Sequence, residues 1–426
     1  MNSKNLFSNS IFYGGLVFFV SGLLANFFNY LYRILMARAL GPEDFGELIA
    51  IISFLLILAV PASPVQVAAA RFSAVFEAQE AKMKLKNLFF YLTKIFGLIG
   101  FILAILAFIF VSQIQDFLNF SSKNYIYIAI GTVIVMLFSG VTKGILQGLK
   151  KFLPLSKNIL FESMARPAFA IILVTLGFKV SGALLGFLFS LIFGYFFSLY
   201  FLKNVLGIKQ ESEELFIGKE EKEIWKYVFL TFLAFLFINI LLNVDKVLVK
   251  HYFSPLETGI FSAASTLGQI IFLGISLIAG VLFPVIISER IKNENYFNSL
   301  KISIFFSFLI GLIGFVVFFL FSDKLIILLF GEKYISGAIF LCSYSVSMTL
   351  MGLVFLLSYF FMALNEFSFL YVLVLACFSE LFFIYYWHNN ISQVIFSFSL
   401  ALLLALFGLT GLLFLKRKML YENFNH

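Results

Sequence analysis

The feature that most constrains the fold is a succession of apolar runs, each of about 20 residues, from Ile11 to Leu415. A run of this length forms an α-helix that crosses a hydrocarbon core about 30 Å thick. The runs do not alternate apolar and polar residues, as the strands of a membrane β-barrel do. With 62% hydrophobic and 12% charged residues, the chain could not cover a water-soluble surface. The sequence therefore predicts an all-α integral membrane protein.

About twelve such runs can be delimited, and little sequence is left between them. The first follows a short polar start without a small-residue cleavage site, so we expect it to be retained as a helix. We expect an N-terminal six-helix lobe (1–206), a cytoplasmic linker (207–224) too short for a catalytic domain, and a C-terminal six-helix lobe (225–426). The predicted helices cover residues 11–36, 45–70, 88–112, 125–147, 158–178, 181–205, 225–250, 258–287, 297–321, 336–363, 367–387 and 392–415.

The positive charges predict the orientation of the chain. Most of the 30 Lys and Arg fall on alternate connections, including Lys82, Lys150 and Lys151, if the N-terminus is inside. Cytoplasmic loops carry such an excess, so we expect a multi-pass protein of the plasma or inner membrane with both termini in the cytoplasm. The net charge of +8 then indicates topology and contact with anionic lipids, and a nucleic-acid site is not expected.

Two segments that lie 213 residues apart, half of the 426-residue chain, share a pattern. Residues 26–50 read NFFNYLYRILMARALGPEDFGELIA, and residues 239–263 read NILLNVDKVLVKHYFSPLETGIFSA. Six predicted helices separate the copies, so both halves enter the membrane from the same side. The sequence thus predicts two parallel lobes around a central cavity, a plan known in transporters. The matched pairs are Asn26 and Asn239, Arg33 and Lys246, Pro42 and Pro255, Gly46 and Gly259, and Ala50 and Ala263.

A weaker pair of segments repeats at nearly the same offset. LQGLKKF, at 146–152, corresponds to FMALNEF, at 361–367. The turn in the first pattern also has a simple local interpretation, because Pro42 can start a helix whose first turn, with Glu43 and Asp44, favours negative charge. The duplication and this local role are compatible.

Three short segments resemble a known family: RALGPEDFGELIA, PASPVQVAAARFSA and LLFGEKYISGA. They are similar to the polysaccharide-biosynthesis branch of the multidrug, oligosaccharidyl-lipid and polysaccharide (MOP) flippase superfamily, along essentially the whole chain. The resemblance implies alternating access that moves isoprenoid-pyrophosphate-linked oligosaccharides from the cytoplasmic to the outer leaflet for surface polysaccharide assembly. It implies a transporter and not an enzyme, whose partners are the lipid-linked glycan, membrane lipids and a polymerase or other assembly proteins.

An anionic pyrophosphate cargo requires cations inside the membrane, where charges are costly and usually face a cavity or a partner. Arg33 and Lys246 follow Asn26 and Asn239 by seven residues, so each pair lies on one helix face. We expect these four residues to bind substrate. The alternative is that both cations, near predicted helix ends, extend towards the membrane surface.

Two further arginines are candidates for substrate binding. Arg71, at the inner end of the second predicted helix, could receive a phosphate or act as a surface anchor. Arg166 lies in the fifth predicted helix, four residues after Glu162, a spacing that allows an ion pair within the helix. Because this pair is deep in the predicted membrane span, Glu162 is also a candidate for gating or ion coupling.

Asp245 and Glu380 are the other deep carboxylates. Neutralising either with a proton or sodium ion would change the cost of its burial and could bias inward against outward states, so both are candidates for ion coupling or gating. A simple ion pair with a nearby cation is the alternative. We expect no cofactor and no metal, and Cys342 and Cys377, both in apolar helices, suggest buried side chains.

Four prolines inside predicted helices are hinge candidates, because proline removes a backbone hydrogen bond and invites a bend. Prolines are also common in membrane helices generally. The four are Pro61, Pro64, Pro167 and Pro284.

Two alternatives to a flippase follow from the sequence. The first is an ion-coupled antiporter of drugs or small molecules from the same superfamily, against which a cation-rich cavity argues. The second is a membrane enzyme acting on lipid-linked glycans, which should have a large outer loop that is not apparent here. No Gly-x4-Gly-Lys-[Ser/Thr] motif occurs, so ATP hydrolysis by that route is not expected.

Overall fold

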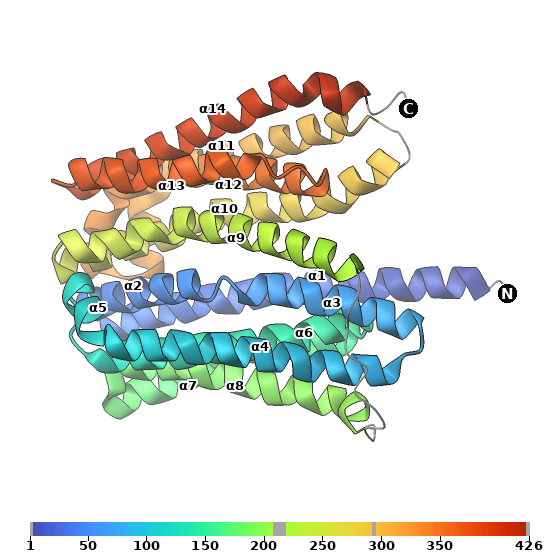
Figure 1. The fold of residues 1–426 in the computed structure, drawn as a ribbon. Coiled ribbons are helices and arrows are strands. Elements are labelled where there is room, and N and C mark those ends of the chain that lie inside the picture. Colours follow the sequence, from blue (N-terminus) through green and yellow to red (C-terminus); the bar gives the residue numbers. More distant parts are fainter. Residues whose placement is uncertain (1–2, 208–218, 292–294, 423–426) are drawn as a thin grey trace. The chain divides into compact units, whose positions relative to one another are not determined.

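The computed structural model describes residues 3–207, 219–291 and 295–422. Regular structure in these residues is helical throughout and includes no strand, which confirms the predicted all-α fold (Figure 1). The chain divides into two compact units, Met1–Phe232 (unit 1) and Leu233–His426 (unit 2). Most of the predicted linker, 208–218, lies outside the described residues.

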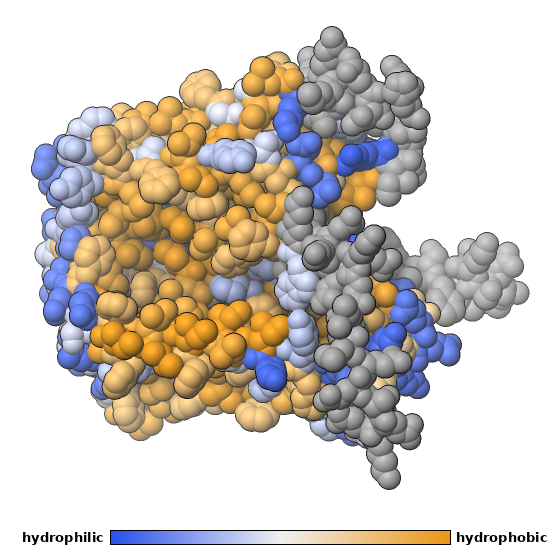
Figure 2. Space-filling view, viewed as in Figure 1, coloured by the Kyte–Doolittle hydropathy of each residue, from blue (hydrophilic) through white to orange (hydrophobic). Residues whose placement is uncertain are grey.

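Among the described residues, nine helical segments are long and apolar enough to cross a membrane, and the bent pair α2–α3 would add a tenth. Figure 2 shows hydrophobic side chains along the helices, with hydrophilic side chains gathered near helix ends. Helix α11 (Tyr296–Leu329) illustrates this, since Phe305, Phe308 and Phe319 are all exposed. Such exposed aromatic rows are suited to lipid and not to water.

Unit 1 is built around α6, which packs against α2, α3, α4, α7 and α8. Gly140, Gly144 and Gly148 recur every four residues on α6 and lie against the backbone of α3. Small residues at this spacing let two membrane helices approach closely. The helices of unit 1 are α1 (Ser3–Leu40), α2 (Pro42–Leu58), α3 (Ala62–Ala78), α4 (Lys82–Ile109), α5 (Val111–Leu118), α6 (Lys123–Gly148), α7 (Phe152–Leu173) and α8 (Lys179–Leu206).

The second predicted helix, 45–70, is wrong as a single helix. It is broken into α2 and α3, which are bent by 43° at residues 59–61. Pro61 stands at the N-cap of α3 and Pro64 in its first turn, where the missing amide hydrogens break the helical ladder. A second irregularity is the π-helical segment Val174–Phe178 between α7 and α8, where Gly177 has a φ of 93°.

Unit 2 is built around α12, which packs against α10, α11 and α14, while α13 packs against α14. A short 3-10 helix, Glu332–Gly337, precedes α12. The division between the units falls within α9. The helices of this half are α9 (Lys219–Tyr252), α10 (Pro255–Ile291), α11, α12 (Ala338–Ala363), α13 (Phe369–Tyr386) and α14 (Ile391–Glu422).

The two halves that share the sequence pattern also share structural features. Helices α6 and α12 hold corresponding central positions: α6 packs against α3, α4 and α8, and α12 against α10, α11 and α14. Two residues after the end of each helix stands a residue in the left-handed conformation, Lys150 (φ 56°) and Asn365 (φ 57°). The next amide then donates back to the helix, from Lys151 to the Leu146 carbonyl and from Glu366 to that of Phe361. This shared C-terminal motif explains the weaker sequence repeat.

The stronger repeat marks the start of the second helix in each half. Pro42 is the first residue of α2 and Pro255 the first residue of α10. Gly41, the N-cap of α2, has a φ of 81°. At the start of α10 a side chain caps the helix, because Ser254 Oγ accepts from the Glu257 amide at 3.3 Å. The polar turn therefore has the local role that its composition predicts.

Candidate functional site

The most substantial charged cluster of unit 1 joins α6 to α7. Lys143 Nζ on α6 donates to Glu162 Oε2 on α7 at 2.7 Å. Arg166, one turn further along α7, places Nη2 3.7 Å from Glu162 Oε1. Glu162 lies ten residues into α7, about 15 Å along its axis, so the cluster is deep in a membrane span. Together with Asn29, these three residues form what we call the cationic cluster.

Arg166 is held by contacts from two other helices of unit 1. Its Nη1 donates to Asn29 Oδ1 on α1 at 2.7 Å. Its guanidinium carbon lies 3.8 Å from the centre of the Phe187 ring on α8, a cation–π contact. Nε is 3.5 Å from Ser190 Oγ, also on α8. The arginine is thus oriented by α1, α7 and α8 together.

The local packing leaves room for the carboxylate of Glu162. Gly194 on α8 faces it, and a Cβ at this position would lie 2.6 Å from Glu162 Oε2. Asn158, one turn before Glu162 on α7, donates to the Gly194 carbonyl and to Ser198 Oγ. The contact between α7 and α8 therefore depends on the small residue opposite Glu162.

The cationic cluster has an excess of positive charge. Two cations share one carboxylate, and Asn29 adds only a neutral oxygen. The side chains of Lys143 and Arg166 keep 15% and 13% of their surface exposed. An excess charge in a low-dielectric environment attracts anions more strongly than it would in water. The cluster is therefore suited to bind an anionic group.

The other predicted cations of unit 1 differ in exposure, and of the two only Arg33 is close enough to Arg166 to interact with its charge. Arg33 lies one turn after Asn29 on α1 and is half-buried, and its guanidinium carbon is 5.9 Å from the centre of the Tyr30 ring. Asn26, also half-buried, is two turns before Arg33 on the same face. Arg71 is exposed on α3. Asn29, Arg33 and Arg166 thus come together in unit 1, whereas Arg71 lies on another helix.

Unit 2 contains a buried charged cluster of different character. Lys246 Nζ on α9 lies 2.8 Å from Asp245 Oδ1 and donates to the Leu242 carbonyl at 2.6 Å. Tyr344 on α12 donates its hydroxyl to Asp245 Oδ2 at 2.7 Å. Lys246 is only 2% exposed. The equivalent of Arg33 is thus a buried cation with its own carboxylate, so Asp245 and Lys246 form the ion pair that their adjacency allows.

Glu380 on α13 is fully buried and lies close enough to Asp245 and Lys246 to interact with both charges. Among the described residues, neither of its carboxyl oxygens has a hydrogen-bond partner. A buried carboxylate in this condition is costly, whereas its neutral form is much less so. The cost of burying Glu380 therefore depends strongly on its charge. We call Asp245, Lys246, Tyr344 and Glu380 the Asp245 cluster.

The remaining predicted residues have local contacts. Asn239 on α9 donates to the Phe235 carbonyl at 2.9 Å, a bond within its own helix. Pro167 lies inside α7, next to Arg166. Pro284 lies within α10, but its side chain is outside what the structure describes. No group of three or more His, Cys, Asp or Glu among the described residues could hold a metal ion.

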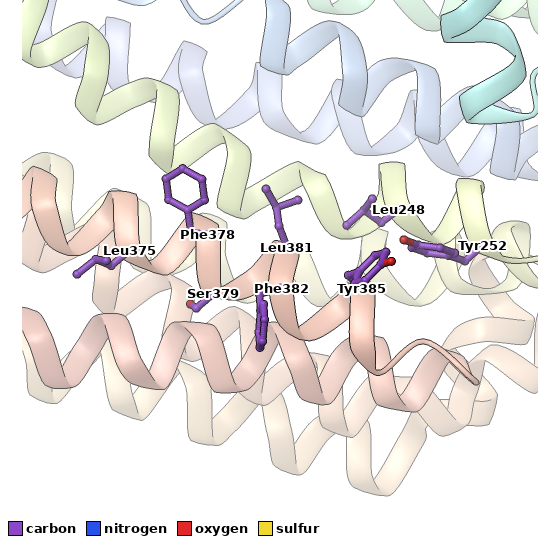
Figure 3. Close-up of a pocket in the computed structure, with 8 residues that line it drawn as sticks. All are labelled: Leu248, Tyr252, Leu375, Phe378, Ser379, Leu381, Phe382 and Tyr385. Carbon is purple, nitrogen blue, oxygen red and sulfur yellow. The ribbon is translucent and has the colours of Figure 1, made fainter.

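An apolar groove runs between α9 and α13 on the surface of unit 2 (Figure 3). Leu248 and Tyr252 line it from α9, and aromatic and leucine side chains such as Phe382 and Tyr385 line it from α13. Of the described residues that line the groove, Ser379, the residue before Glu380, is the only polar one apart from the two tyrosines. The groove is suited to apolar chains.

Sequence reasoning missed three residues that organise these sites: Lys143, Asn29 and Tyr344. A lysine within the apolar segment VTKGILQG was the available signal for the first, since an intramembrane charge needs a partner. Asn29 and Tyr344 carry no such signal, because polar and aromatic residues are frequent throughout the chain.

Comparisons with known proteins identify the family and the fold. Residues 11–289 match the sequence profile of the family described as polysaccharide biosynthesis protein. An inward-facing MATE-family multidrug resistance transporter of the MOP superfamily has 16% identity and a TM-score of 0.75, covering 94% of this chain and 95% of that one. The lipid II flippase MurJ in an inward closed conformation has 18% identity and a TM-score of 0.72, covering 94% and 87%. No curated protein sequence matches the chain.

The fold thus defines the class: a multi-pass membrane protein with the architecture of the flippases and multidrug transporters of the MOP superfamily. Within that class, the chain belongs to the polysaccharide biosynthesis protein family. The resemblance to the polysaccharide-biosynthesis branch is thereby confirmed, and two of the three short segments that suggested it, RALGPEDFGELIA and PASPVQVAAARFSA, lie within the matched residues.

Proposed function

We propose that the chain is an alternating-access flippase that moves an isoprenoid-pyrophosphate-linked oligosaccharide from the cytoplasmic to the outer leaflet for surface polysaccharide assembly. The observation that carries this proposal is the cationic cluster of unit 1, where Lys143 and Arg166 share one carboxylate at membrane depth. A pyrophosphate would satisfy both cations, since guanidinium and ammonium groups are strong phosphate partners. Family membership supports a glycan as the remainder of the cargo.

In this proposal Arg33 and Asn26 extend the binding surface along α1 from Asn29. Arg71 receives the headgroup at the inner end of α3. Lys246 and Asn239, both on α9, stay candidate contacts for the cargo in unit 2, where Lys246 is paired with Asp245 in this structure. In this proposal the hinge positions include Pro61, at the bend between α2 and α3, and Pro167, beside Arg166.

The transport assay measures the entry of a fluorescent lipid-pyrophosphate oligosaccharide into the protected leaflet of reconstituted vesicles. Arg166→Ala and Arg33→Ala should each reduce the rate by at least about tenfold, because each removes a charged contact to the cargo. Lys157→Ala is the control, since Lys157 is an exposed cation on α7 outside the cluster. Native activity that neither variant changes would contradict the site, and native inactivity would contradict the function.

We further propose that transport is coupled to a proton, or else to sodium, at Glu380 and Asp245. The support is the burial of Glu380 without a hydrogen-bond partner among the described residues. Vesicles with an imposed pH gradient or sodium gradient distinguish the two ions. The proton form of the proposal requires that a pH gradient alone change the native rate and leave that of Glu380→Gln unaffected.

The second candidate is an ion-coupled antiporter of drugs or small molecules. It is favoured by the TM-score of 0.75 with a multidrug transporter and by the two buried carboxyls of unit 2. The excess positive charge of unit 1 opposes a cationic cargo. Uptake of a fluorescent organic cation by the same vesicles, without translocation of the lipid-linked glycan, would favour the antiporter.

A further inference from the structure

The cationic cluster contains an anion of its own. Glu162 bonds to Lys143 at 2.7 Å through one carboxylate oxygen and lies 3.7 Å from Arg166 through the other. It therefore stands between the two cations that a phosphate group would contact. The side chain of Glu162 is 10% exposed, against 15% for Lys143 and 13% for Arg166, so all three charges are largely buried.

We infer that Glu162 is an internal counter-anion, which pairs with Lys143 and Arg166 in this structure and is displaced from between them when a pyrophosphate binds. The identity of this anion rests on the proposed function, while the competition between carboxylate and anion rests on the geometry of the cluster. Glu162 is thus a determinant of affinity that opposes binding and favours release.

The first argument is one of charge. A single carboxylate neutralises one of the two cations, and Asn29 satisfies Arg166 only with a neutral oxygen at 2.7 Å. A pyrophosphate carries more negative charge and more acceptor oxygens than a carboxylate. It can therefore pair closely with the guanidinium and the ammonium at the same time. Glu162 is close only to Lys143, at 2.7 Å, and lies 3.7 Å from Arg166.

The second argument is steric. Asn29, Phe187 and Ser190 fix the guanidinium of Arg166 independently of Glu162, so this cation stays in position when the carboxylate leaves. The carboxylate is opposed by Gly194, which has no side chain to hold it. The anchored partner is thus the arginine, and the displaceable one is the glutamate.

The experiment measures the binding of inorganic pyrophosphate to the purified full-length chain by calorimetry. Glu162→Gln keeps the shape of the side chain and removes the competing charge, so affinity should rise by at least about tenfold. Lys143→Gln removes a ligand of the pyrophosphate, so affinity should fall by at least about tenfold. Lys157→Gln removes an exposed positive charge from the same helix and should leave the affinity within about twofold of native.

A second variant tests the same idea without changing any charge. In Gly194→Ala the new Cβ would lie 2.6 Å from Glu162 Oε2, the oxygen that bonds Lys143, so the carboxylate must move and affinity should rise. Gly131→Ala on α6 is the matched control, because its nearest neighbour, a Leu188 methyl, would be at 3.9 Å. If Glu162→Gln does not fold, the comparison of Gly194→Ala with Gly131→Ala decides whether Glu162 competes with the bound anion.

The inference is overturned if Glu162→Gln folds and binds pyrophosphate no more tightly than the native chain, or if neither binds it. It is likewise overturned if Gly194→Ala leaves the affinity unchanged when Glu162→Gln cannot be purified. Opposite effects of Glu162→Gln and Lys143→Gln on affinity, in a chain that does not translocate the glycan, would uphold the inference and refute the flippase. Translocation of the glycan without those opposite effects on affinity would support the flippase and overturn the inference about Glu162.

Discussion

Gly144 on α6 lies directly against the backbone of Gln66 on α3: a Cβ at Gly144 would be 2.4 Å from the Gln66 carbonyl oxygen. The side chain of Gln66 donates to Gln147, three residues further along α6, at 3.1 Å. This close contact ties the second half of the bent α2–α3 pair to the central helix of unit 1. The bend at Pro61 is thus flanked by a tightly packed segment.

We expect Gly144→Ala to destabilise the chain by about 1–3 kcal/mol, because the added methyl must displace the backbone of α3 and not a flexible side chain. Thermal unfolding in detergent measures the loss. Gly131→Ala on the same helix, which has space for its methyl group, should change stability little. Equal melting temperatures for the two variants would contradict the close contact of α3 with α6.

A second prediction concerns the hydroxyl of Tyr344. Tyr344→Phe removes the 2.7 Å hydrogen bond to Asp245 and leaves a buried carboxylate with one partner fewer. The expected loss of stability is about 1–3 kcal/mol, the cost of an unsatisfied buried acceptor. Tyr371→Phe is the control, since Tyr371 is exposed on α13. A Tyr344→Phe chain as stable as this control would show that the Asp245 cluster does not depend on the hydroxyl.

A third prediction contrasts the two carboxyls of unit 2. Asp245→Asn leaves the buried ammonium of Lys246 without its carboxylate at 2.8 Å, and should cost about 3–5 kcal/mol. Glu380→Gln should cost much less, because neither oxygen of Glu380 has a hydrogen-bond partner among the described residues. Chemical unfolding followed by tryptophan fluorescence measures both. Similar losses would mean that Glu380 has a structural partner of its own.

The fold class could be predicted because it follows from the length and composition of the apolar runs. The break between α2 and α3 could not be placed, although Pro61 and Pro64 were both identified, because membrane helices often continue past prolines. Whether a proline bends or breaks a helix depends on the packing around it. Here that includes the contact of Gly144 with Gln66, which joins residues distant in sequence.

In the candidate sites, too, only contacts between residues close in sequence could be predicted. The Glu162–Arg166 pair could be predicted from a spacing of four residues, since neighbours on a helix face are a local property. Lys143 and Asn29, which complete the cluster, come from other helices and depend on tertiary packing. The duplication made Arg33 and Lys246 equivalent, yet Asp245 beside Lys246 gives the second cation a different partner. The first half has Tyr32 before Arg33, at the position equivalent to Asp245, with no such charge.

The last prediction concerns the start of α10, where the second copy of the polar turn differs from the first. Ser254 and Glu257 form a reciprocal cap: the Glu257 amide donates to Ser254 Oγ at 3.3 Å, and the Ser254 amide donates to Glu257 Oε2 at 3.1 Å. Gly41, the corresponding cap of α2, has no side-chain bond. The second copy is therefore the one that depends on a side chain at this position.

Ser254→Ala should remove about 1 kcal/mol of local stability, the usual value of an N-cap side chain. Hydrogen exchange at the Glu257 amide should then accelerate about fivefold, since local opening becomes correspondingly more frequent. Ser254→Thr keeps the acceptor oxygen and should exchange at nearly the native rate. The cap would be refuted by an Ala variant whose Glu257 amide exchanges no faster than that of the Thr variant, because the two differ in whether the hydroxyl is present.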